Sequence, residues 1–124
     1  MQDSFAAGSQ LAQSRPGVTT AVSLLTAVMA TEITRIAVCN TTASSVDFSL
    51  FHDDDGNTFD QSTALHYQEP LAGNTTKYID AAALGGGLVL QAGGQLGFQS
   101  ATVNALTITV YGVTQDIAAR VPRG

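Results

Sequence analysis

The feature that most limits the fold of this chain is a series of short apolar runs, rich in β-branched residues and separated by turn-forming clusters. Runs of this kind, at this spacing, are typical of the strands of an antiparallel sandwich or barrel. Eight runs fit the description, at residues 20–25, 31–40, 45–52, 62–68, 75–80, 87–91, 95–100 and 105–113. We therefore predict an all-β fold: an eight-stranded antiparallel β-sandwich of the jelly-roll type.

Alternation within the runs indicates which side chains face the core. In the last run, Leu106, Ile108 and Val110 fall on one face, and two threonines and a tyrosine fall on the other. Runs 45–52 and 95–100 alternate in the same way. Because successive side chains of a strand point to opposite faces, each of these runs predicts one core face and one outer face.

Run 31–40 has apolar residues on both faces. Strict alternation places Ile33, Ala37 and Cys39 on one face and Ile36 and Val38 on the other. A central strand that is covered on both sides has this pattern. The second cover would be either the opposite sheet or another subunit.

The length of 124 residues corresponds to one domain with one core. Residues 1–17 are rich in Gln, Ser, Ala and Gly, lack a sustained period and end at Pro16 and Gly17. We predict a flexible N-terminal arm at 1–17, a sandwich domain at 18–115 and a C-terminal tail at 116–124.

The charge balance excludes two classes of partner. Only 12% of the residues are charged, and the net charge is -5, with five cationic side chains in the whole chain. Binding to nucleic acid or to an anionic membrane needs a basic surface, which this sequence does not supply. No apolar run approaches the roughly 20 residues needed to span a bilayer. We predict neither a nucleic-acid nor a membrane partner.

The stretch FHDDDGNTFD is the strongest candidate for a metal site. Its possible ligands are Asp53, Asp55 and Asn57. The spacing of a calcium-binding EF-hand loop fails, because Thr58 stands where glycine is needed and Leu65 where the bidentate glutamate is needed. Asp-Gly and Gly-Asn steps also favour a β-hairpin connection with solvated aspartates. The turn is the preferred interpretation, ion binding stays open, and no cofactor is predicted.

No arrangement of residues predicts catalysis. Cys39 is the only cysteine, and it lies in the middle of the most apolar run, where a cysteine usually behaves as a small hydrophobic residue. Neither His52 nor His66 has a neighbouring Ser or Cys in a local pattern that marks a nucleophile. We predict that the protein is not an enzyme.

Carbohydrate binding is the main alternative among sandwich functions. Sugar rings commonly stack on exposed aromatic side chains, and the chain has no tryptophan. Tyr67, Tyr78 and Tyr111 are the possible platforms, and alternation places Tyr111 on an outer face. The same tyrosines also suit a rim or a subunit contact.

The segment TEITRIAVCNTTASSVDFSLF resembles a family of small β-sandwich virion structural proteins of tailed bacteriophages. In that family one strand ends in an apolar residue, then Cys or Ala, then Asn. A Thr/Ser/Gly turn and an alternating strand follow it. An acidic Gly turn, a run like GLVLQAGGQLGF and a threonine-alternating strand follow. The corresponding residues here are 36–42, 46–51, 53–56, 87–98 and 105–113.

This resemblance, which spans roughly residues 20–113, implies a virion structural role. The implied protein is a capsid decoration (cement) protein on the outer surface of the capsid. It would form a homotrimer, bind the major capsid protein and stabilise the head. Similar sandwiches also occur in fibres and tail tips. The alternative is therefore the receptor-binding or glycan-binding head of a phage fibre or tail tip.

Overall fold

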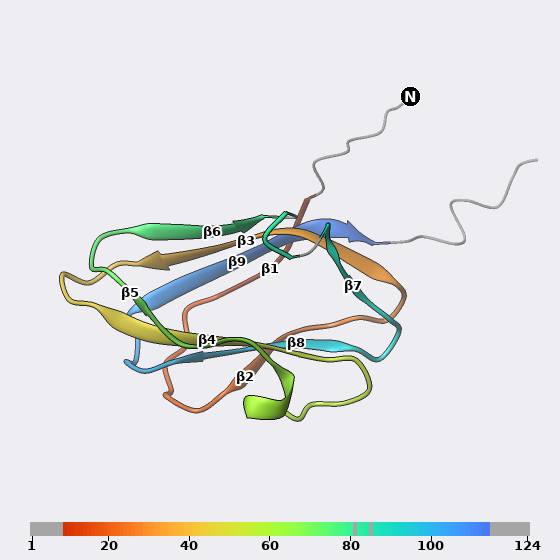
Figure 1. The fold of residues 1–124 in the computed structure, drawn as a ribbon, viewed down its shortest axis with the longest axis horizontal. Coiled ribbons are helices and arrows are strands. Elements are labelled where there is room, and N and C mark those ends of the chain that lie inside the picture. The colour runs from red at the N-terminus through yellow and green to blue at the C-terminus, as the bar shows by residue number, and fades with distance from the viewer. Residues whose placement is uncertain (1–8, 81, 85, 115–124) are drawn as a thin grey trace, which may run out of the picture.

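The computed structural model describes residues 9–80, 82–84 and 86–114, and it shows two antiparallel sheets packed face to face (Figure 1). The strands of the described residues are β1 Ser9–Ser14, β2 Val22–Thr26, β3 Thr31–Asn40, β4 Val46–Asp53, β5 Ala64–Leu71, β6 Thr76–Asp80, β7 Leu88–Leu90, β8 Gln95–Ser100 and β9 Leu106–Thr114. One 3-10 turn, η1, covers Gln61–Thr63. The predicted all-β sandwich is confirmed.

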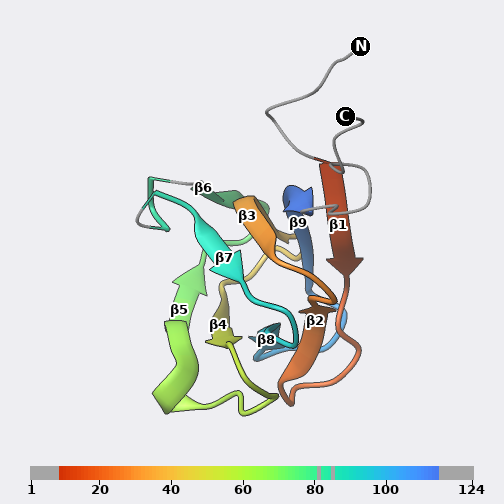
Figure 2. The ribbon, with the colours of Figure 1, turned by 90° about the vertical axis from the view of Figure 1, so that its right-hand side faces the viewer.

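The strand order is that of a jelly roll. The first sheet has the order β1-β9-β3-β6, with β7 also paired to β3, and the second has the order β2-β8-β4-β5. The pairs β4/β5, β3/β6, β2/β8 and β1/β9 are nested within one another along the chain. A long hairpin of this kind, rolled so that alternate pairs fall in opposite sheets, gives the two layers seen end-on in Figure 2.

Strand β1 corrects the predicted N-terminal arm. All eight predicted runs form strands, and residues 9–14, which we expected to be flexible, form a ninth strand paired with β9. The pairing comes from backbone hydrogen bonds at a sheet edge, and Leu11 and Ala12 pack against the core. Because most of its side chains are Gln and Ser, this strand contains no apolar run that would mark it in the sequence. Residues 1–8 and the predicted tail at 116–124 lie outside the described residues.

The core lies between the sheets and is built from the inward faces that alternation predicts. Phe48 of β4 and Phe98 of β8 stack with ring centroids 5.9 Å apart, and both are almost fully buried. Leu106, Ile108 and Val110 of β9 have no exposed surface. Each fully buried side chain of this size stabilises the fold by about 1.5–3 kcal/mol.

A β-bulge in β3 changes the face assignment of one residue. The register with β9 shifts between Ile33 and Arg35, so Ile33 points inward together with Ile36 and Val38. Strict alternation had placed Ile33 on the opposite face, and this assignment is wrong because the bulge inserts an extra residue. No described strand or helix lies over the outer face of this sheet (Figures 1 and 2).

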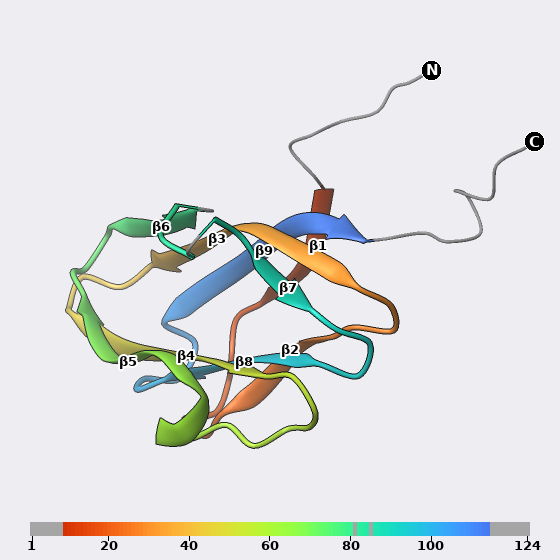
Figure 3. The same cartoon turned by 45° about the vertical axis from the view of Figure 1, so that its right-hand side comes forward.

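Strand β7 lies at the open end of the sandwich. It pairs with residues 31–33 of β3 and runs obliquely from the first sheet toward the second (Figure 3). Within the part of the chain that the structure describes, no helix has the length and apolar character needed to cross a membrane.

Candidate functional site

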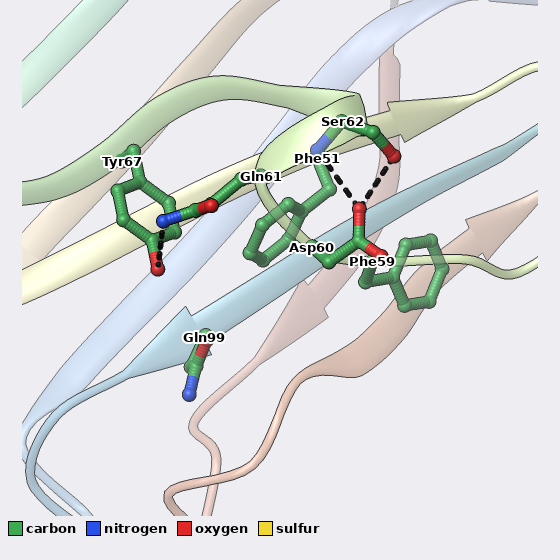
Figure 4. A pocket seen from close by; sticks show the side chains of 7 residues that line it. All are labelled: Phe51, Phe59, Asp60, Gln61, Ser62, Tyr67 and Gln99. Atoms are coloured by element: carbon green, nitrogen blue, oxygen red, sulfur yellow. Dashed lines mark hydrogen bonds between the residues drawn. The ribbon is translucent and has the colours of Figure 1, made fainter.

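The outer face of the second sheet carries an open groove of about 690 Å³. It lies beside the connection between β4 and β5, which folds back over the sheet (Figure 4). The aromatic side chains that line it are Phe51, Phe59 and Tyr67. The polar side chains that line it are Asp60, Gln61, Ser62 and Gln99.

A glycine of β8 allows the connection to lie against the sheet. A Cβ atom at Gly97 would lie 2.6 Å from a ring carbon of Phe59, which is too close for any side chain. The ring of Phe59 therefore rests on Gly97, and it also contacts Phe51 with a centroid distance of 6.0 Å. Phe51 is an outward-facing residue of β4 that this loop buries. These contacts form the apolar side of the groove.

A capping box fixes the polar side. The Asp60 Oδ1 atom accepts hydrogen bonds from the Ser62 backbone N–H at 2.8 Å and from the Ser62 hydroxyl. The Thr63 side chain accepts from the Asp60 N–H and completes the box at the start of η1. The hydrogen bonds from the Ser62 hydroxyl and N–H hold the pKa of Asp60 below its usual value, so the groove carries a carboxylate at neutral pH.

Two further polar side chains are held in place on either side of the groove. Gln61 Nε2 donates to the Tyr67 hydroxyl at 3.3 Å, and Gln99 Nε2 donates to the Thr19 carbonyl at 2.9 Å. Tyr67 is 45% exposed. Among the described residues, nothing hydrogen-bonds to the amide oxygens of Gln61 and Gln99 or receives the Tyr67 hydroxyl proton. These groups are available to a ligand.

A second, smaller hollow of about 80 Å³ lies beside the groove. Its lining residues are Asp47, Ser49, Gln68, Gln99 and Ala101. Gln99 lines both hollows, so the two lie next to each other on this sheet.

The acidic stretch folds as a turn that depends on one buried carboxylate. Asp53 is only 8% exposed, and its two oxygens accept from the N–H groups of Thr58 at 2.7 Å and Asp55 at 3.2 Å. These bonds, led by the one from Thr58, lower the pKa of Asp53. The hydrogen bond and negative charge of Asp53 raise the pKa of Asp55. The expectation that all the aspartates are solvated is wrong for Asp53, because its carboxylate is buried where it accepts hydrogen bonds from two backbone N–H groups of the loop.

The three candidates for a metal site, Asp53, Asp55 and Asn57, lie in or beside this turn. The described residues contain no group of three or more His, Cys, Asp or Glu side chains able to hold a metal ion. Asp53 is committed to backbone N–H groups, and Asp55 and Asn57 are exposed on the loop. The neighbouring Asp54 accepts from the Gln91 N–H at 3.0 Å and so connects the turn to the loop before β8.

The cysteine and the histidines lie on different sheets. Cys39 belongs to β3 of the first sheet, whereas His52 and His66 belong to β4 and β5 of the second. His52 Nε2 lies 3.3 Å from a carboxylate oxygen of Asp54, and His66 pairs with Glu69. The structure does not bring together the thiol and imidazole groups that we considered for catalysis.

Of the three tyrosines considered as platforms, only Tyr67 lines the groove. Tyr78 is 63% exposed on β6, and the guanidinium carbon of Arg35 lies 5.9 Å from its ring centroid. Tyr111 of β9 is paired with Arg35 and is half-buried. Tyr78 and Tyr111 therefore belong to the outer face of the first sheet.

Asp60, Gln61 and Gln99 were not identified from the sequence as site residues. The Asp-x-x-Thr spacing from Asp60 to Thr63 is a readable signal for a capped turn. Alternation in run 95–100 also places Gln99 on an outer face. Neither signal shows that the two segments meet, because their contact depends on strand order.

No protein-family model matches the chain, and no curated protein matches its sequence. The site is therefore interpreted from its own geometry.

Proposed function

We propose that this protein is a structural protein of a tailed-phage virion, and specifically a homotrimeric decoration protein on the outer surface of the capsid. It binds the major capsid protein and stabilises the head. Binding that occurs only on the intact shell shifts the equilibrium away from rupture, because the contacts must break before the shell opens.

The observation that carries the proposal is the outer face of the first sheet. At its centre Ala37 of β3 pairs with Thr109 of β9 on one side and with Tyr78 of β6 on the other. The side chains of Ala37 and Thr109 are small and uncharged, and Thr109 is only 6% exposed. Small side chains beside an exposed tyrosine, with the guanidinium of Arg35 near its ring, suit a contact between protein subunits.

Exposed apolar residues at one end of the same sheet also support the proposal. Val89 of β7 and Val113 of β9 both pair with Glu32 of β3, and they are 46% and 42% exposed. The side chain of Glu32, which is also exposed, lies between the two valines, so this end of the sheet combines apolar area with one charge. Exposed apolar side chains among few charges are a feature of contacts between protein subunits. We assign this face to the contact between copies in the trimer.

The first test is the oligomeric state. Sedimentation of the purified protein is expected to give a trimer, and Ala37→Arg is expected to give monomers because it places an unpaired charge in the middle of the contact. Thr26→Arg adds the same charge to an exposed position of β2 in the other sheet and is the control. A monomeric wild-type protein, or equal behaviour of the two variants, contradicts the assigned contact.

The second test is the effect on the shell. Phage heads assembled without this protein are mixed with it, and their rupture temperature is measured. A decoration protein binds the heads and raises that temperature. A protein that shows no affinity for any head contradicts the proposal.

The second candidate function is the receptor-binding head of a phage fibre or tail tip, and the groove over the second sheet favours it. A receptor-binding protein attaches to host cells in the absence of any capsid. Cell binding by the isolated protein, without binding to heads, would select this function over decoration.

A further inference from the structure

We infer that the groove over the second sheet is a binding site for a neutral saccharide. The inference goes beyond capsid decoration, and it applies whether the protein sits on a head or on a fibre. It depends on the chemistry of the groove and on no feature of the first sheet.

The shape of the site suits an elongated ligand. The groove volume of about 690 Å³ lies within the range of roughly 300–1,000 Å³ that is usual for small-ligand sites. The second hollow lies beside it at Gln99 and includes Asp47 in its lining. An open groove on a sheet surface, with a second hollow beside it, accommodates a short chain of sugar rings better than a compact molecule that must be enclosed.

The lining combines the two kinds of surface that a sugar ring presents. A pyranose has C–H faces that stack on aromatic rings and hydroxyl groups around its edge that form hydrogen bonds. Here Tyr67 supplies the exposed ring. The amide oxygens of Gln61 and Gln99 accept from hydroxyl groups, and the Tyr67 hydroxyl donates to one. Acceptors and a donor therefore accompany an aromatic platform: Gln61 lies against Tyr67, and Gln99 lies apart from them in the same lining (Figure 4).

The charge of the site selects a neutral ligand. None of the seven residues that line the groove is cationic, and Asp60 is ionised because Ser62 lowers its pKa. Asp47 adds a second carboxylate in the neighbouring hollow. A phosphate, a sulfate or an acidic sugar would meet unpaired negative charge, whereas a neutral hydroxyl group donates to a carboxylate in a charge-assisted hydrogen bond.

The side chains are fixed before any ligand arrives. The Asp60 capping box, the hydrogen bond between Gln61 and Tyr67, and the contact of Phe59 with Gly97 hold the loop in place. A preorganised site loses less conformational entropy on binding than a mobile one.

The experiment uses the full-length protein and an array of immobilised glycans that contains neutral and acidic oligosaccharides. Affinities of the hits are then measured by titration calorimetry with the free oligosaccharides. We expect neutral glycans to bind, and we expect Tyr67→Ala and Gln99→Ala to weaken their binding about tenfold or more each. The control is Tyr78→Ala, which removes an even more exposed tyrosine from the other sheet.

Three results would overturn the inference: binding of no neutral glycan, preferential binding of acidic glycans, or equal losses from Tyr67→Ala and Tyr78→Ala. Far-UV circular dichroism verifies that each variant is folded. The Ala37→Arg variant distinguishes this site from the decoration function, because it should retain glycan binding after losing trimer formation. Tyr67→Ala should conversely retain binding to heads.

Discussion

Asn40, the last residue of β3, connects two loops at one end of the sandwich. Its side chain is 1% exposed, and its Nδ2 donates to the carbonyls of Ser44 at 2.8 Å and Leu71 at 3.0 Å. Its Oδ1 accepts from the N–H and the hydroxyl of Thr42. All four hydrogen-bonding positions of this buried amide are used, which makes it a structural residue.

We expect Asn40→Ala to lower the free energy of unfolding by about 2–3 kcal/mol, because buried backbone groups lose their partners. Asn40→Asp keeps the acceptor but places a carboxylate oxygen against two carbonyls, so a loss of similar size is expected. Urea unfolding followed by circular dichroism measures both. Asn57→Ala, at an exposed position of the acidic turn, is the control and should change little. A loss at Asn57 equal to that at Asn40 would contradict this role.

At the scale of elements, β1 shows how an edge strand is held. It pairs with β9 from Ser9 to Ser14, with a bulge between Gln10 and Ala12. On the outer side Gln13 Nε2 donates to the Thr109 hydroxyl at 2.9 Å. On the inner side Leu11 packs against the core. Strand β9 is therefore an interior strand with a partner on each side.

We expect Leu11→Asp to lower the free energy of unfolding by about 2 kcal/mol or more, because it places a charge where an apolar side chain is packed. Gln10→Asp introduces the same side chain at the preceding exposed position and should be nearly neutral. Urea unfolding of the two variants compares them directly. If residues 9–14 were a flexible arm instead of a strand, both changes would be equally harmless.

The sequence predicts elements well where one face is apolar and poorly where the backbone alone makes the contact. Run 105–113 alternates cleanly, and it forms β9 over Leu106–Thr114. Ser9–Ser14 carries little apolar area, so its pairing depends on the vacant edge of β9, which no local pattern reveals. The bulge beside Thr34 was hidden for the same reason, since it is a property of the pairing of β3 with β9.

At the scale of the whole molecule, strand order decides which distant residues meet. Strand β4 lies between β8 and β5 in the second sheet, so Gln99 and Tyr67 lie on either side of Phe51 and the groove forms between them. The sequence indicated Tyr67 as a possible platform, but it did not indicate which side chains lie near that ring. The acidic stretch is recognisable as a motif because its residues are adjacent in the sequence. The groove is formed by residues from separated segments, so no local motif marks it.

A cluster of three charged or titratable side chains connects the two sheets beside the turn from β5 to β6. Glu69 of β5 forms an ion pair with Lys77 of β6 at 3.0 Å, and its other oxygen contacts the His66 ring. Partial burial raises the pKa of Glu69, but the hydrogen bonds from Lys77 and His66 lower it by more, so it lies below the ordinary value of 4.5. The ionised form of Glu69 is therefore the one that stabilises the fold.

The pH dependence of stability follows from the sign of this shift. The unfolded chain binds a proton at Glu69 more readily than the folded chain, so the contribution is complete above 4.5 and is lost as the pH falls through the lowered pKa. We expect the difference in unfolding free energy between wild type and Glu69→Gln to shrink as the pH falls from about 6 to about 3. Carboxyl titration by NMR should give a Glu69 pKa below 4.5 in the wild type and a higher value in Lys77→Met, which removes the partner from the opposite sheet. A stability difference that is constant with pH, or a Glu69 pKa that Lys77→Met leaves unchanged, would show that this ion pair does not hold the two sheets together.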